Sequence, residues 1–256
     1  MNVDLPIHPI KPVMMKLALL LPALLLSTTL IAQQAPDTVK KAIVVKEDFS
    51  DDWADLRHYE AENKTLPPPA EGEKRVVFLG SSIFERWKAL VPEYFNNNKA
   101  YIDRGVSGQI SAQLLLRFRQ DVINLNPAAV IILAGSNDIA GTQGHVTNNR
   151  IMDNIRSMVE LAQLNHIKVI LCAYLPVYEY PWRKGLQPAD KIIALNKLIK
   201  DFATANSITL LDYFTPLADS RNGQKAELTL DGVHPNVAGY KIMADATDKA
   251  IKKALK

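Results

Sequence analysis

The sequence predicts an α/β protein, a three-layer α/β/α sandwich around a five-stranded, mostly parallel sheet. Five short apolar runs recur along the chain, and segments with apolar residues at helical spacing separate them. Continuously apolar strands that alternate with helices are typical of a parallel sheet covered on both faces. A chain of 256 residues has room for one sizeable domain of this kind.

The first 32 residues have the pattern of a secretory signal peptide. Lys16 precedes an apolar run over residues 17–32, which Pro22 interrupts. The run is too short for a comfortable transmembrane span and has a charged start before an apolar stretch. We expect cleavage near Ala32, a periplasmic or extracellular protein, and no stable membrane insertion afterwards. An uncleaved N-terminal anchor is the alternative interpretation.

The net charge argues against a nucleic-acid-binding protein, and the single cysteine excludes an intramolecular disulfide. The chain has 30 Lys and Arg and 27 Asp and Glu, and removal of residues 1–32 leaves 28 and 26, a net charge of about +2. This balance provides no basic stripe for nucleic acid. Cys172 lies inside an apolar run without a disulfide partner, so the core must hold the fold.

No cofactor or metal ion is expected. Neither GxxxxGK[ST] nor GxGxxG follows a predicted strand, so a nucleotide site has no support. His58, His145 and His166 are scattered and lack the spacing of metal ligands.

The chain divides into three expected parts. A signal peptide, an N-terminal extension with a helix and a Pro-rich linker, and the main domain cover residues 1–32, 33–72 and 73–256. In the extension, residues 43–45 predict a short edge strand. Residues 51–64 predict a helix with Trp53, Leu56 and Tyr59 on one face.

The main domain alternates between strands and helices, and Asn236 is expected to cap its last helix. The expected strands are residues 76–79, 100–103, 128–134, 168–173 and 209–212. The expected helices are residues 83–90, 111–124, 148–165, 189–206 and 236–256.

Two serines follow the first strand of the main domain. The turn Gly80-Ser81-Ser82 leads into a helix, whose N-terminus favours negative charge. A serine here can be a nucleophile, and the alternative is a serine that only caps the helix. The residues alone leave open whether Ser81 or Ser82 has that role.

Other strand ends supply possible partners. Asp231 and His234 are three residues apart in a Gly-containing turn, so the carboxylate can reach Nδ1 of the imidazole and leave Nε2 free. The amides of Ser82 and Gly108 and the side chain of Asn137 can form an oxyanion hole. In isolation, an Asp-Gly-x-His loop is more often a capping turn than a catalytic pair, and Gly-Ser-Asn-Asp is commonly a turn with a helix cap. The alternative for Gly105 and Gly108 is that they only supply unusual backbone angles.

The loop after the fourth strand is dense in aromatic residues. Tyr178, Tyr180 and Trp182 are candidates for contact with a sugar ring or an acyl chain, and the alternative is a rigid loop packed on the sheet edge. Arg104 and Arg183 are candidates for an anionic group, with a surface salt bridge as the alternative.

Four motifs in this order resemble the SGNH hydrolase superfamily, the GDSL-type esterases and lipases. The pattern is closest to the platelet-activating-factor acetylhydrolase-like branch. The motifs are Gly80-Ser-Ser-Ile83, Arg104-Gly-Val-Ser-Gly108, Gly135-Ser-Asn-Asp138 and Asp231-Gly-Val-His-Pro235.

The resemblance implies a flavodoxin-like sheet and a set of roles. It assigns Ser82 as nucleophile, Asp231 and His234 as its partners, and Ser82, Gly108 and Asn137 as the oxyanion hole. The family's usual Gly-Asp-Ser is Gly-Ser-Ser here, so Ser81 replaces an aspartate.

The expected function is an exported serine esterase that hydrolyses short-chain, chiefly acetyl, esters of small molecules or carbohydrates. A lipid or lysophospholipid acylhydrolase is one alternative. A catalytically silent carbohydrate-binding member of the same fold is another, against which the intact Ser, His and Asp set argues.

Overall fold

Five parallel strands form the central sheet, in the order β2-β1-β3-β4-β5. The structure, a computed structural model, describes residue 48 and residues 50–256. The strands are β1 (Val76–Gly80), β2 (Tyr101–Gly105), β3 (Ala129–Ile132), β4 (Lys168–Ala173) and β5 (Thr209–Asp212). This order is that of flavodoxin-like sheets, so the α/β prediction is confirmed. The expected signal peptide and edge strand lie outside the described residues.

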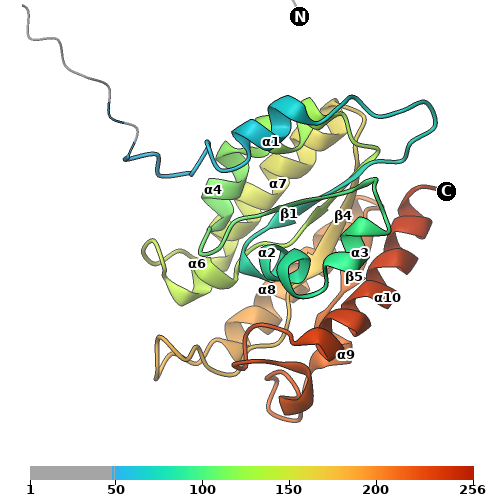
Figure 1. Ribbon diagram of the computed structural model, residues 1–256. Coiled ribbons are helices and arrows are strands. Elements are labelled where there is room, and N and C mark those ends of the chain that lie inside the picture. The colour runs from blue at the N-terminus through green and yellow to red at the C-terminus, as the bar shows by residue number, and fades with distance from the viewer. Residues whose placement is uncertain (1–47, 49) are drawn as a thin grey trace, which may run out of the picture. The chain divides into compact units, whose positions relative to one another are not determined.

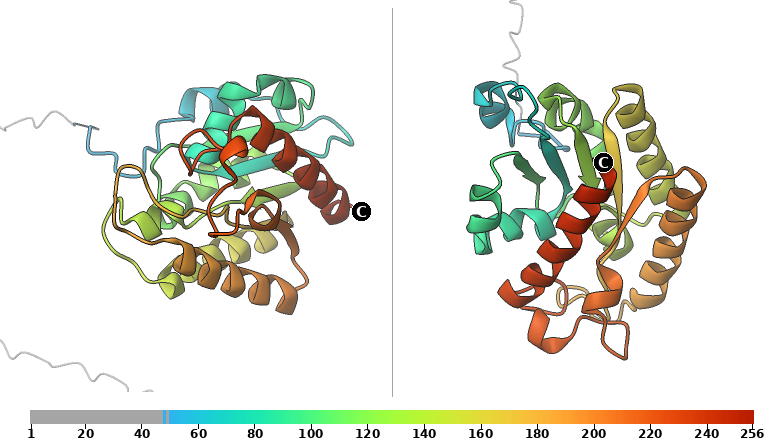
Figure 2. Two further views of the ribbon diagram at one scale, coloured as in Figure 1. Left: turned by 90° about the horizontal axis from the view of Figure 1, so that it is seen from below. Right: turned by 90° about the vertical axis from the view of Figure 1, so that its right-hand side faces the viewer.

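Helices cover both faces of this sheet (Figure 1). One face carries α2 (Ser82–Leu90), α3 (Pro92–Asn96) and α10 (Val237–Ala254). The other carries α7 (Asn148–Leu164) and α8 (Ala189–Ala205), and Figure 2 shows both layers. The remaining elements are α1 (Glu60–Thr65), α4 (Ser111–Leu116), α5 (Phe118–Asp121), η1 (Ile123–Leu125), α6 (Ser136–Ala140), α9 (Phe214–Leu217) and η2 (Ala226–Leu228).

An aromatic cluster fixes α2 against α3 and α10. Trp87 is fully buried, and its ring stacks on Tyr94 at 4.7 Å and on Tyr240 at 5.3 Å between centroids. The Tyr240 hydroxyl also donates to the Ile83 carbonyl at 2.8 Å. The first turn of α2 is therefore tied to the start of α10. Asn236 caps α10 as expected, because its side chain accepts from the Gly239 amide.

The helix expected over residues 51–64 is wrong for most of its length. Only α1 is helical, and the residues before it form turns. Asp55 has a left-handed backbone with φ +50°, and the Asp52 carboxylate accepts from the Arg57 amide. Side-chain hydrogen bonds of this kind compete with a helix, which explains the shortening.

The helix expected over residues 111–124 is interrupted. It divides into α4, α5 and η1, with breaks at Arg117 and Val122. The Arg117 side chain is completely buried and reaches the ends of β1 and β2. Helical spacing could not predict this break, because it accompanies contacts with distant strands.

Gly105, the last residue of β2, allows the start of α2 to pack directly on the sheet. A Cβ at this position would lie 2.3 Å from the Glu85 amide nitrogen and 2.8 Å from the Ser81 carbonyl oxygen. Both atoms belong to backbone, which cannot move without displacing the turn that carries Ser82.

We expect Gly105→Ala to lower the free energy of unfolding by about 3 kcal/mol, because overpacking forces backbone shifts. Urea denaturation measures this change. The matched control is Gly72→Ala, where φ is +77° but nothing lies within 4 Å of the added carbon. That control should cost about 1 kcal/mol, the strain of a left-handed alanine. Equal losses in the two variants would contradict the close-approach argument.

Candidate active site

The loops after the parallel strands meet at one edge of the sheet, because all five strands point the same way. Ser82 is the first residue of α2, directly after β1. Gly108 follows β2, and Asn137 lies in α6 after β3. His234 lies in the loop before α10.

Ser82, His234 and Asp231 form a continuous line of hydrogen bonds. Ser82 Oγ lies 3.0 Å from His234 Nε2, and His234 Nδ1 lies 2.8 Å from Asp231 Oδ2. The other oxygen of Asp231 accepts from the backbone amides of His234 at 2.8 Å and Val233 at 3.0 Å. The carboxylate is therefore held from two sides and fixes the orientation of the ring.

The electrostatics of this line favour a neutral imidazole beside an ionised carboxylate. Burial lowers the pKa of His234 below its ordinary value of 6.5, and the hydrogen bond and charge of Asp231 offset only part of that effect. Burial alone would raise the pKa of Asp231. Hydrogen bonds from His234 and from the Val233 amide outweigh this effect of burial, so the pKa of Asp231 falls below its ordinary value of 3.8. A neutral ring can accept a proton from a serine.

Ser81 lies elsewhere. Its side chain is buried, and its carbonyl accepts from the amides of Phe84 and Glu85. Of the two serines, Ser82 is thus the one within hydrogen-bond distance of His234.

Three groups in the loops that follow β1, β2 and β3 can donate to a developing negative charge. The Ser82 amide belongs to the first turn of a helix and has no helical acceptor. Gly108 has φ +78°, and its missing Cβ faces open space. One N–H of Asn137 donates to the Gln109 carbonyl at 2.9 Å, which leaves the second N–H of that amide for another acceptor.

Gln109 was not singled out from the sequence. Its carbonyl holds the Asn137 side chain, so it links the loop of Gly108 to α6. The only available signal was its position next to Gly108, because glutamine itself indicates no chemistry.

The three aromatic candidates lie in different environments. Tyr180 is fully buried, and its hydroxyl bonds to the Ser136 hydroxyl and carbonyl at 2.9 and 3.0 Å. Its expected contact with substrate is therefore corrected: the ring belongs to the core. Trp182 is 53% exposed and its ring centroid lies 6.1 Å from that of His234. Tyr178 is also exposed and carries Arg221 over its ring.

Of the two arginines considered for an anionic group, Arg104 forms an ion pair with the half-exposed Glu62 at 2.9 Å, whereas Arg183 forms none with the described residues. Arg104 is fully buried, bonds to Asn63 and Glu62 of α1, and lies over the Tyr59 ring. Arg183 donates to the carbonyls of Ala140 and Gly141. Both hold loops in place, which single-residue reasoning could not predict.

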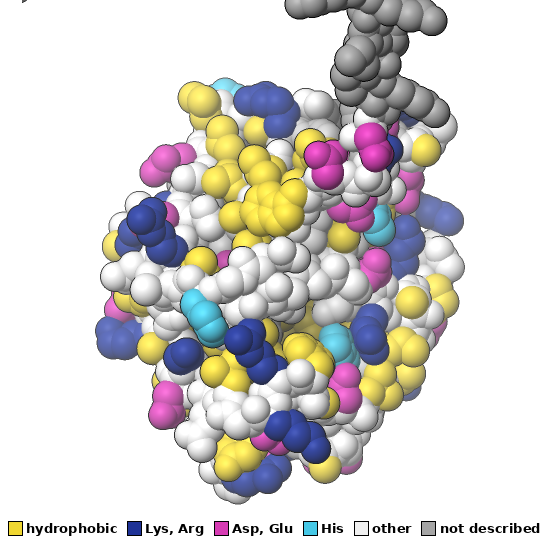
Figure 3. All heavy atoms as spheres, turned by 90° about the vertical axis from the view of Figure 1, so that its left-hand side faces the viewer, with side chains coloured by type: hydrophobic (Ala, Val, Ile, Leu, Met, Phe, Trp, Pro, Cys, Tyr) yellow, Lys and Arg dark blue, Asp and Glu magenta, His cyan; other side chains and the backbone are white. Residues whose placement is uncertain are grey.

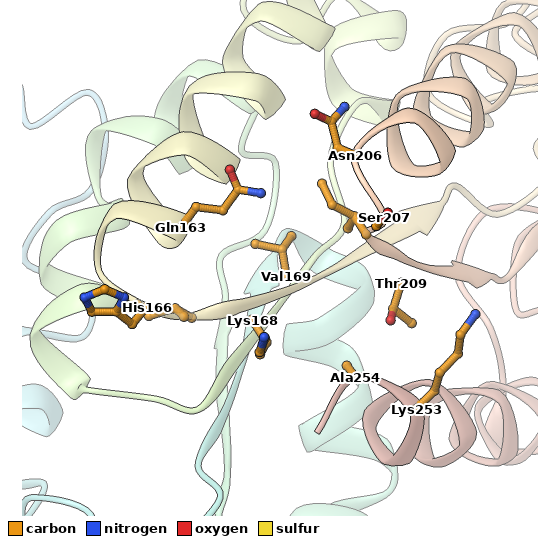
Figure 4. Close-up of a pocket in the computed structure, with 11 residues that line it drawn as sticks. Gln163, His166, Lys168, Val169, Asn206, Ser207, Thr209, Lys253 and Ala254 are labelled. Carbon is orange, nitrogen blue, oxygen red and sulfur yellow. The ribbon is translucent and has the colours of Figure 1, made fainter. Parts of the chain in front are cut away.

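A cavity of about 580 Å³ lies at the opposite end of the sheet, where β4 and β5 begin (Figure 4). It has no contact with Ser82 or His234.

Figure 3 shows histidine side chains beside basic and apolar ones on the face seen from the left of Figure 1. Within the part of the chain that the structure describes, no group of three or more His, Cys, Asp or Glu is placed to hold a metal ion.

Residues 78–242 match the model of the GDSL-like lipase/acylhydrolase family. The chain belongs to this family. It is therefore an ester-hydrolysing enzyme, and the predicted superfamily is confirmed. The family's matched residues begin in β1 and end within α10, so they include every loop described above.

Solved structures support the same conclusion for this acylhydrolase. A protein of Bacteroides fragilis with a proposed acylhydrolase activity is 44% identical, covers 82% of this chain and 100% of its own, and has a TM-score of 0.78. A GDSL-like lipase of Bacteroides thetaiotaomicron is 45% identical over 79% of this chain and 100% of its own, with a TM-score of 0.77.

Two more distant proteins are also similar to this chain. A structure from Streptococcus pneumonia, described by a proposed relation to platelet activating factor, is 23% identical over 77% of this acylhydrolase and 90% of its own chain. Its TM-score is 0.64, and it shares the fold. An uncharacterized lipoprotein of Bacillus subtilis is 29% identical over 98 residues, which are 37% of this chain and 40% of that relative.

The lowered pKa of His234 predicts the acid limb of the activity. Hydrolysis that needs the neutral ring should rise with pH and reach half of its plateau below pH 6.5, because protonated His234 cannot accept a proton. The measurement is kcat/KM for p-nitrophenyl acetate against pH. Asp231→Asn removes the group that raises the His234 pKa, so the limb should move to lower pH while the plateau falls by about 10² to 10⁴-fold. A wild-type midpoint above pH 6.5 would contradict this assignment.

Proposed function

We propose that this acylhydrolase is an exported serine esterase that removes short acyl groups, chiefly acetyl, from carbohydrates. The observation that carries the proposal is the line from Ser82 Oγ to His234 Nε2 and from His234 Nδ1 to Asp231. A nucleophile, a base and an orienting carboxylate in this order are the requirements for acyl transfer through serine.

In the proposed mechanism His234 takes the Ser82 proton as Ser82 Oγ attacks the ester carbonyl. The N–H groups of Ser82, Gly108 and Asn137 stabilise the tetrahedral oxyanion. His234 then protonates the leaving alcohol, and water attacks the acyl-enzyme by the same route. Asp231 keeps the ring oriented and stabilises the imidazolium.

The proposed substrate class rests on Trp182. Its exposed ring lies 6.1 Å, between centroids, from His234, the residue that would protonate the leaving alcohol. An exposed indole offers an apolar face on which a sugar ring can stack. A carbohydrate alcohol at this position would bring the acyl carbonyl towards Ser82.

Export is proposed from the pattern of residues 1–32 and from the distant relative, which is a lipoprotein. The chain has a single cysteine, Cys172, which is buried in β4, so no cysteine near Ala32 is available for a lipid. None of the helices within the described residues is both long and apolar enough to cross a membrane. N-terminal sequencing of the protein recovered outside the cytoplasm tests the cleavage near Ala32.

Ser82→Ala should lower kcat for p-nitrophenyl acetate by about 10⁴-fold or more, because Ser82 Oγ is the hydroxyl that, among the described residues, bonds to His234 Nε2. Ser81→Ala should keep kcat within about tenfold of the wild type, since it removes a buried hydroxyl that does not bond to His234. Circular dichroism of both variants controls for folding. An active Ser82→Ala together with an inactive Ser81→Ala would assign the nucleophile to Ser81.

A panel of esters from acetylated sugars to long-chain p-nitrophenyl esters tests the substrate class. We expect the highest kcat/KM with acetylated sugars, and Trp182→Ala should raise KM for them by about tenfold through the lost stacking. Trp182→Phe is the control that keeps an aromatic face. Preference for long chains would favour the lipid acylhydrolase, and a folded protein that cleaves none of the esters would favour the silent carbohydrate-binding member.

A further inference from the structure

Gln109 lies at the junction of the groups proposed to bind the oxyanion. It follows Gly108 directly, and its carbonyl accepts from Asn137 Nδ2 at 2.9 Å. Its side chain is 5% exposed and satisfied at both ends. Nε2 donates to the Ala54 carbonyl at 2.7 Å, and Oε1 accepts from Arg117 Nε at 2.5 Å. Gln109 therefore fixes both the position of Gly108 and the orientation of Asn137.

Arg117 connects this residue to the turn that carries Ser82. Its guanidinium is fully buried and donates to the Gly80 carbonyl at 2.9 Å and to the Arg104 carbonyl at 2.7 Å. These carbonyls stand at the ends of β1 and β2. The carboxylate of Asp121, in α5, lies 2.9 Å from the Arg117 guanidinium and neutralises its charge. A planar guanidinium can hold several acceptors in a fixed relation, which a single ammonium cannot do.

We propose that Gln109 and Arg117 are positioning residues that set the distance between the Ser82 nucleophile and its oxyanion donors. Arg117 holds the Gly80 carbonyl two residues before Ser82 and, through Gln109, holds Gly108 and Asn137. Neither side chain touches the reacting atoms. They act on the reaction by fixing the backbone on both sides of the ester carbonyl.

The contacts of Arg117 differ from those of another buried arginine, Arg75. The Arg75 guanidinium donates to the carbonyls of Leu125 and Pro67, at the opposite end of β1. Arg75 therefore supports the fold without reaching the loops of the site. Both arginines stabilise the sheet, but of the two only Arg117 is placed to control the geometry of the oxyanion donors.

The energetic reason for such a framework is that oxyanion stabilisation depends on preorganised donors. A donor contributes fully only when it already lies about 3 Å from the place where the negative charge develops. A small displacement of Gly108 or Asn137 weakens binding of the transition state and leaves binding of the ground-state ester nearly unchanged, so the loss is expected in kcat.

The test compares the full-length wild type with Gln109→Met and Arg117→Lys. Methionine keeps the length of the glutamine side chain without its hydrogen bonds, and lysine keeps the charge without the planar fork. We expect kcat for p-nitrophenyl acetate to fall by about 10 to 100-fold with KM within about threefold. The rate constant for labelling of Ser82 by an alkyl fluorophosphonate should fall in proportion, because attack at phosphorus also places an oxygen among these donors.

Gln113→Met and Arg75→Lys are the matched controls. Gln113 is also buried; its side chain donates to the Trp53 carbonyl and accepts from the Ile110 amide, and this side chain has no bond to Arg117 or Asn137. Both controls should lower thermal stability while keeping kcat and the labelling rate constant within about threefold of the wild type. A purely structural role for Gln109 would give it the same behaviour as these controls.

The inference rests on the proposed function, and the two can fail separately. A wild type that neither hydrolyses p-nitrophenyl acetate nor labels at Ser82 overturns the proposed function and the inference with it. A wild type that does both, with Gln109→Met unchanged in kcat and labelling, overturns the inference alone. If Arg117→Lys does not fold, Gln109→Met decides.

Discussion

The hydrogen bond between Ser82 Oγ and His234 Nε2 joins residues 152 positions apart in the sequence, and the rest of the site depends on it. It forms because α2 and α10 pack side by side on the same face of the sheet (Figure 2). Trp87 stacks on Tyr240, and the Tyr240 hydroxyl holds the Ile83 carbonyl. The packing of two helices thus sets a distance that neither the serine turn nor the histidine loop could set alone.

The loop that carries His234 is rigid for a different reason. Its backbone is held by hydrogen bonds that link both of its sides. The Leu230 amide and the Thr229 hydroxyl both donate to the His234 carbonyl at 2.8 Å, and Gln224 Nε2 donates to the Val233 carbonyl. Because Asp231 belongs to the same turn, the carboxylate and the imidazole move as one unit. The imidazole is consequently already aimed at Ser82 before an ester arrives.

Much of the fold could be predicted from the sequence, because strongly apolar strands and long amphipathic helices have local causes. The strands over residues 168–173 and 209–212 have the expected bounds, and the order of strands and helices is correct. The single helices predicted over residues 111–124 and 51–64 were wrong, because Arg117 and Asp55 adopt backbone conformations that apolar spacing cannot predict. Long-range burial of Arg117 decided the first case, and a local side-chain hydrogen bond from Asp52 decided the second.

The candidate site was predictable where one loop contains both partners and unpredictable where the partners come from distant segments. The spacing of Asp231 and His234 indicated their contact. The choice between Ser81 and Ser82 required the distance to His234, and the burial of Tyr180 required the position of Ser136. Ser81, which stands where the family has an aspartate, is buried, and spacing along the chain could not predict that burial.

The most direct test of the central claim is to identify the acyl-enzyme. Brief incubation with p-nitrophenyl acetate, an acid quench, proteolysis and mass spectrometry would locate the acetyl group on the chain. We expect it on Ser82 Oγ, in an amount that declines after the substrate is exhausted. Acetylation of Ser81, or steady turnover with no serine acetylated, would contradict a mechanism in which Ser82 attacks with His234 as its base.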